Sequence, residues 1–254
     1  MSVKQKVMER EKIPLSEVLS TPGAKRVVVQ IIFFIGGMVS SHGVVFGRCA
    51  PFGVAAISAV PYRNLWATAL GAIFGYLIPS SAQMPVRYIA ALLAAVAIRW
   101  TLNDLIKVCR HPAFAPLVAF GPIFATGIAM IVVSGTPSGG MAIYLAESLL
   151  AAGSAYFFAR TCTLAMDGRG IRALRNQDTA CVALTCGVLV LSLSGVEIAG
   201  ISLGRVLAVL AILLSARSGG VAGGSISGIA AGVVLSLGTV GISYFSGAYA
   251  LGGK

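Results

Sequence analysis

Long apolar runs, separated by short polar or basic stretches, make up almost all of the chain after residue 26. Because a helix needs about 20 apolar residues to cross the hydrocarbon core of a membrane, such runs indicate spanning helices. We therefore predict an all-α, polytopic integral membrane helical bundle of about ten transmembrane segments, with eight as the lower bound. The expected spans are 27–46, 50–60, 64–79, 88–104, 113–134, 140–160, 178–194, 199–215, 219–236 and 239–252.

The apolar runs differ in length, and the polar stretches between them mark the parts of the chain. Runs 50–60 and 239–252 are too short to cross a bilayer as regular helices, so we interpret them as half-helices or re-entrant elements. Residues 1–26 form a polar N-terminal tail, and 27–254 form the multi-spanning domain. The basic loop 167–178, with the sequence D-G-R-G-I-R-A-L-R-N-Q-D, separates a six-span part from a four-span part.

Lysine and arginine positions predict the orientation of this bundle. Cations in short loops are retained on the cytoplasmic side during insertion. With ten spans, fifteen of the nineteen Lys and Arg residues fall on one side, and only Arg48 and Arg87 fall on the other. Both termini are therefore expected in the cytoplasm. Arg99 and Arg205 lie within spans, and Arg99 is close enough to a span end for its guanidinium to reach the interface.

Composition excludes a soluble protein. Apolar residues make up 57% of the chain, charged residues only 11%, and the mean hydropathy is +0.91. The net charge of +11 comes from cations in short loops and not from a basic face interleaved with aromatic residues. We therefore expect the lipid bilayer as the partner of these cations, and no nucleic acid.

Two ionisable residues inside predicted spans need partners. Burying a charge such as that of Glu147 or Arg205 at mid-membrane costs at least about 2.5–3.5 kcal/mol on insertion scales. The two could form an intramembrane charge pair across the sixth and eighth spans, or Glu147 could be protonated and hydrogen-bonded. An alternative function follows from the same residues, namely a stand-alone transporter or channel that uses Glu147 and Arg205.

Glycines recur every fourth residue in the ninth predicted span. They are Gly220, Gly224, Gly228 and Gly232. Residues four apart share one helix face, and a face without side chains lets another helix approach closely. This face is expected to pack a helix of the same bundle or to mediate self-association between chains.

The sequence holds no recognisable metal or cofactor motif. The five cysteines show no C-x-x-C spacing and no histidine partner, which argues against a zinc or redox site. The three aspartates, Asp104, Asp167 and Asp178, are scattered along the chain. We expect no catalytic site, metal site or cofactor in this chain.

Three segments resemble the membrane region of stage II sporulation protein E, from endospore-forming bacteria. The segment G-R-C-A-P-F-G-V-A at 47–55 includes Gly47, Arg48, Pro51, Phe52 and Gly53. The segment Y-L-A-E-S-L-L-A-A-G occupies 144–153, and G-I-S-L-G-R-V-L-A-V-L occupies 200–210, before the glycine-rich span. Their order, together with the ten-span count, extends the resemblance over nearly the whole chain.

The resemblance implies a membrane anchor and oligomerisation module. In that family, the membrane region precedes a metal-dependent serine/threonine phosphatase that acts in forespore sigma-factor activation at the polar division septum. Manganese or magnesium would be expected only in such a phosphatase, following Lys254. The implied partners are further copies of the chain and proteins of the division septum, and the implied location is the bacterial cell membrane.

Overall fold

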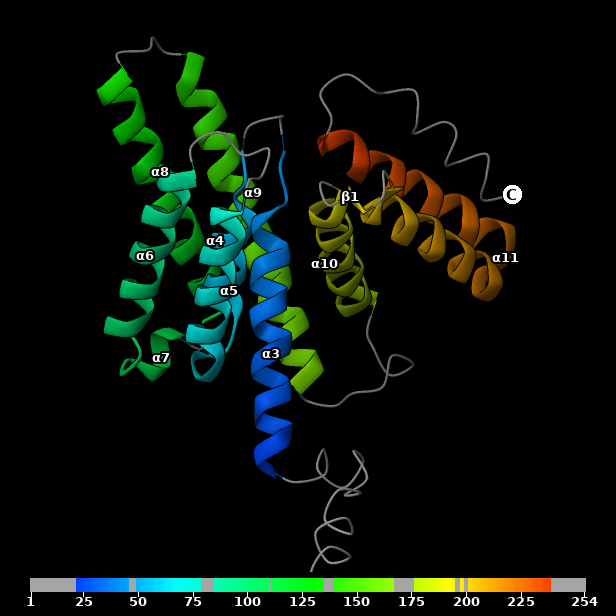
Figure 1. The fold of residues 1–254 in the computed structure, drawn as a ribbon, viewed down its shortest axis with the longest axis horizontal. Helices are drawn as coiled ribbons and strands as arrows, with labels where there is room; N and C mark the ends of the chain where they lie inside the picture. The colour runs from blue at the N-terminus through cyan, green and yellow to red at the C-terminus, as the bar shows by residue number, and fades with distance from the viewer. Residues whose placement is uncertain are drawn as a thin grey trace, which may run out of the picture.

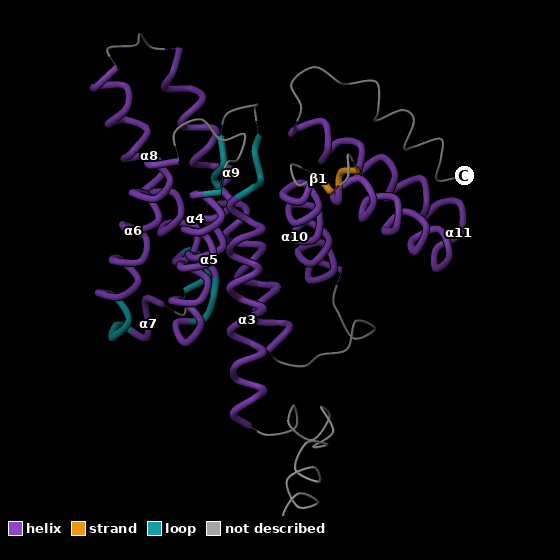
Figure 2. Tube along the Cα trace, in the orientation of Figure 1, coloured by secondary structure: helices purple, strands orange, loops and turns teal. Residues whose placement is uncertain are grey.

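The computed structural model describes residues 22–45, 49–78, 85–109, 111–134, 139–166, 176–194, 197–198 and 201–238. These residues are almost entirely helical (Figure 2). The helices are α3 (Pro22–Ser41), α4 (Phe52–Ala59), η2 (Tyr62–Asn64), α5 (Leu65–Leu77), α6 (Pro85–Thr101), α7 (Ile106–Cys109), α8 (Phe114–Ser134), α9 (Gly139–Met166), α10 (Asn176–Ser194) and α11 (Leu203–Gly238). Two short antiparallel strands, β1 (Glu197–Ile198) and β2 (Ile201–Ser202), connect α10 to α11 (Figure 1).

Four described helices are long and apolar enough to cross a membrane. They lie within α3, α8, α9 and α10. The predicted runs 113–134 and 178–194 coincide closely with α8 and α10. The helical, membrane-type architecture is thus confirmed, whereas the count of about ten spans stays a prediction. The tenth run, the N-terminal tail up to residue 21 and loop residues 167–175 lie outside the described residues.

The eighth and ninth predicted spans both fall within one helical element, and their separation into two spans stays a prediction. Helix α11 continues from Leu203 to Gly238 across residues 216–218. The residues between the two predicted spans, Ala216, Arg217 and Ser218, include no proline and can all continue a helix. In Figure 1 the ribbon of α11 nevertheless changes direction where its colour passes from gold to orange.

Helix α4 is a short helix at the centre of the bundle. Its eight residues extend about 12 Å, less than half of a hydrocarbon core. Every residue from Phe52 to Ser58 is buried. Helices α3, α5, α6, α8 and α9 all contact it. Run 50–60 thus corresponds to a short buried helix, and its interpretation as a half-helix or re-entrant element stays a prediction.

Helices α3 and α5 run parallel and pack very closely. The Gln30 side-chain amide, on α3, donates to the Arg63 carbonyl and to Asn64 Oδ1, both at 3.1 Å. Further along both helices, a Cβ added at Gly75 would meet the Ser41 hydroxyl and the Met38 carbonyl. The chain therefore runs in the same direction in both helices. Residues 42–64, including α4, must lead the chain from the end of α3 back to the end of the bundle at which α3 and α5 both start.

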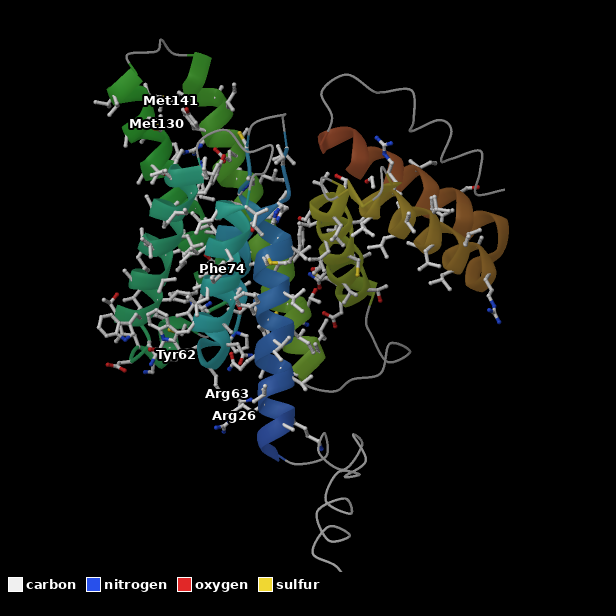
Figure 3. All side chains as sticks on the ribbon, in the orientation of Figure 1. Arg26, Tyr62, Arg63, Phe74, Met130 and Met141 are labelled. Carbon is white, nitrogen blue, oxygen red and sulfur yellow. The ribbon has the colours of Figure 1, made fainter. Side chains whose placement is uncertain are left out.

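The two ends of the bundle differ in chemistry. Figure 3 places Arg26, Tyr62 and Arg63 toward one end, which we call the basic end, and Met130 and Met141 toward the opposite end. Because α3 and α5 run parallel, Arg26 and Arg63 share an end although a returning segment separates them in sequence. This arrangement is compatible with the orientation that the lysine and arginine positions predict.

Candidate functional site

Glu147 and Arg87 form a buried ion pair between α9 and α6. The Arg87 Nη2 atom lies 2.7 Å from Glu147 Oε2, and the two side chains are 7% and 0% exposed. The Tyr88 hydroxyl donates to the other carboxylate oxygen, Oε1, at 2.6 Å. Both oxygens of the carboxylate are thus satisfied by α6, which makes this the most polar part of the described core.

A charge pair with Arg205 was one of the two arrangements predicted for Glu147, and the structure shows a pair with Arg87 instead. The reason is topological: α6 packs on α8 and α8 on α9, whereas α11, which carries the exposed Arg205, packs on α10 and β2. Arg87 lies in the first turn of α6 and turns inward to reach the carboxylate. The pairing adds a role for Arg87 that the sequence did not indicate, and the placement of Arg87 on the outer side of the membrane stays a prediction.

Arg87 is held by more than its carboxylate. Its guanidinium carbon lies 4.5 Å from the ring centroid of Tyr144 and 5.1 Å from that of Tyr88. Its Nη2 atom is also 3.4 Å from the Ile123 carbonyl on α8. Its Nε atom is buried and has no hydrogen-bond partner among the described residues. Two aromatic faces, a carboxylate and a carbonyl thus fix one cation, which ties α6 to α8 and α9.

The first sequence motif packs directly against this cluster. The Tyr76 hydroxyl donates to the Ala50 carbonyl at 2.7 Å, and its ring stacks on Tyr88 with centroids 5.4 Å apart. A Cβ at Gly53 would approach the Tyr76 hydroxyl to 2.6 Å, so only glycine fits against that ring. The Cys49 thiol lies close to Tyr88 and Glu147.

Two segments far apart in sequence, 47–55 and 144–153, therefore meet around one charge pair. Pro51 and Phe52 are buried beside Gly53 at the start of α4. Gly47 and Arg48 lie outside the described residues. The arrangement is suited to holding helices in a fixed relation, because each polar group of Glu147 and Tyr88 is engaged by a neighbour inside the core.

Part of the predicted glycine face is buried within the single chain. Gly228 and Gly232 lie on α11 and are buried, while the structure gives no burial for Gly220 and Gly224. Self-association through the face stays a prediction.

Acidic residues do not cluster elsewhere among the described residues. Asp104 is exposed, and Asp178 binds Arg160 through a 2.8 Å contact between Oδ1 and Nε. Within the part of the chain that the structure describes, no three His, Cys, Asp or Glu side chains lie close enough together to hold a metal ion. Asp167 lies outside that part.

Removing the Tyr88 hydroxyl should loosen the cluster without breaking the ion pair. In Tyr88→Phe one carboxylate oxygen loses its donor, and we expect a loss of about 1 kcal/mol in the free energy of unfolding, since interhelical hydrogen bonds in membranes contribute about that much. Unfolding of the detergent-solubilised chain with sodium dodecyl sulfate measures it. Tyr144→Phe is the control, because it keeps the ring that faces Arg87. Equal stabilities of the two variants would contradict the assigned role of the hydroxyl.

Comparison with known families gives a match over nearly the whole chain. The family described as SpoIIE, N-terminal domain, matches residues 3–253. No curated protein and no solved structure matches the chain.

Proposed function

Because the chain belongs to the family of SpoIIE N-terminal domains, we propose that it is the membrane anchor and oligomerisation module of a sporulation serine/threonine phosphatase. In this role it would hold the enzyme at the polar division septum during forespore sigma-factor activation. Family membership over nearly the whole chain is the observation that carries the proposal. The N-terminal SpoIIE domain is itself a non-catalytic region.

The structure supports an anchoring role through its apolar surface and its fixed core. Large apolar side chains on α3, α8 and α9 are exposed, as lipid-facing residues of a membrane helix would be. The Arg87–Glu147 pair and the buried α4 join α6, α8 and α9 into one packed unit. A rigid bundle of this kind would keep an attached enzyme at a fixed position on the membrane surface.

We propose ten spans with both ends cytoplasmic, with Arg26 and Arg63 on the cytoplasmic side. A cytoplasmic phosphatase would then meet its soluble protein substrate on that side. The partners we propose are further copies of the chain and proteins of the division septum. The structure does not support the transporter or channel alternative, because Glu147 is paired with Arg87 and buried in the described core.

Localisation tests the proposal directly. A fluorescent fusion of residues 1–254, expressed in sporulating cells that lack their own copy, should concentrate at the polar septum. Fusions in two colours should show energy transfer if the chains associate. Uniform fluorescence over the whole membrane would contradict septal anchoring, and absence of energy transfer at equal expression would contradict oligomerisation. A single-span membrane anchor with the same fluorophore is the control for crowding at the septum.

A further inference from the structure

A cavity of about 630 Å³ opens near the basic end of the bundle, between α4, α6, α7, α8 and α9. Its polar lining consists of Tyr62, Arg99, Asn103, His111, Arg160 and a few hydroxyl-bearing side chains. The described lining residues include no aspartate and no glutamate. A volume of this size is typical of small-molecule sites. The cavity therefore combines room for a ligand with a positive lining.

Arg99 gives this cavity a cation that has no carboxylate partner among the described residues. Its Nη1 atom donates to the Ile57 carbonyl at 2.5 Å, in the last turn of α4, where a helix end is partly negative. The two ion pairs among the described residues belong to Arg87 and Arg160. A half-buried guanidinium in an apolar bundle is stabilised by a counter-ion. Among the described residues none supplies it, so the cavity favours an external anion.

Arg160 and His111 add donors to the same lining. Arg160 binds Asp178 only through Nε, and its side chain is 48% exposed. The Ala113 backbone N–H donates to Nδ1 of His111 at 3.2 Å, so the neutral ring carries its proton on Nε2. The terminal nitrogens of Arg160 and the Nε2–H of His111 are thus donors for an oxyanion.

The rest of the wall is apolar. Ala59, Phe114 and Met166 line the cavity beside the arginines. Tyr62 and Tyr156 also line it, and amphipathic rings of this kind prefer the boundary between lipid and water. A free phosphate would use only the donors, whereas a lipid would place its phosphate on the arginines and its first methylene groups on the apolar wall.

We propose that this cavity is a binding site for an anionic phospholipid of the leaflet at the basic end. Arg99 and Arg160 bind the phosphate, and His111 and Tyr62 donate to the headgroup. Basic pockets between helices on the cytoplasmic side are suited to such headgroups. The proposal goes beyond anchoring, because it makes a defined lipid species a ligand of the bundle. It stands independently of any septal role.

Lipid retention by the full chain tests the site. The chain is purified in mild detergent, delipidated, and titrated with phosphatidylglycerol or phosphatidylcholine, with native mass spectrometry as the readout. We expect one phosphatidylglycerol per chain, bound at least about tenfold more tightly than phosphatidylcholine. Arg99→Gln should weaken phosphatidylglycerol binding about tenfold, and Arg160→Gln by a smaller factor, since its charge is partly neutralised by Asp178.

Arg63→Gln is the matched control, because it removes one cation at the same end and Arg63 does not line the cavity. If Arg99→Gln fails to fold through loss of the α4 contact, Arg160→Gln combined with His111→Ala tests the same site. Equal binding of the two lipids, or equal losses in Arg63→Gln and the cavity variants, would overturn the proposal. Displacement of phosphatidylglycerol by millimolar inorganic phosphate would also overturn it, because the site would then take phosphate alone.

Discussion

Replacing Glu147 by glutamine should produce the largest loss of stability of any single change considered for this chain. The substitution keeps the shape of the side chain and removes its charge, which leaves Arg87 as a buried cation without its carboxylate. Breaking a buried pair from one side costs about 3–5 kcal/mol. We expect a loss of this size in the free energy of unfolding, measured by sodium dodecyl sulfate titration of the solubilised chain.

A double variant separates the charge effect from the loss of packing. Replacing Arg87 by methionine and Glu147 by leucine removes both charges, and a well-packed apolar replacement of a buried pair is often neutral or stabilising. We expect this variant to recover most of the lost stability. Arg160→Gln is the control for an exposed pair and should cost less than about 1 kcal/mol. A Glu147→Gln loss no larger than that of Arg160→Gln would show that the buried pair is not a structural element.

Replacing Gly71 by alanine should give the second largest effect. A Cβ at this position would overlap the backbone carbonyl of Phe34 on α3, and a backbone group cannot rotate away. The two helices would have to separate along their contact. Overpacking of this kind costs about 1–3 kcal/mol, and we expect the upper half of that range because a whole helix pair must shift. Thermal unfolding followed by circular dichroism would measure it.

Gly36 supplies the matched control on the partner helix. A Cβ at Gly36 would meet nothing within 4 Å, so Gly36→Ala changes helix propensity alone. We expect Gly36→Ala to leave stability unchanged or raise it by up to about 1 kcal/mol. Gly37→Ala, which would meet the Thr68 carbonyl, should behave like Gly71→Ala. If Gly36→Ala and Gly71→Ala had equal effects, close packing of α3 on α5 would be contradicted.

The all-helical fold class and the ends of several helices were predictable from the sequence. A long apolar run in lipid must satisfy its backbone hydrogen bonds internally, which favours a helix. Runs 113–134 and 178–194 correspond to α8 and α10 with shifts of two residues or fewer. The short run 50–60 corresponds to the short helix α4, as its length indicated. Hydropathy falls at Ala216–Ser218, which separated two predicted spans, whereas helical structure runs through these residues within α11.

The partner of Glu147 was not predictable from charge alone. Two cations, Arg87 and Arg205, were available, and only the packing of α6, α8 and α9 decides between them. The sequence did contain an indication, since Arg87 immediately precedes Tyr88 at the start of the predicted span 88–104, where an arginine can reach inward. Gly71 and Gly75 also have the G-x-x-x-G spacing, and this pair packs against α3 in the structure.

The returning segment has a consequence for how the chain is inserted. Because α3 and α5 point the same way, residues 42–64 act as a topological switch although α4 is too short and too enclosed to be inserted on its own. Its burial depends on α5, α6, α8 and α9, which are synthesised later. During translation α4 therefore lacks its final packing partners, and it becomes fully buried only after α9 has been synthesised and inserted. Omitting the segment would join α3 to α5 as a hairpin and invert every helix that follows.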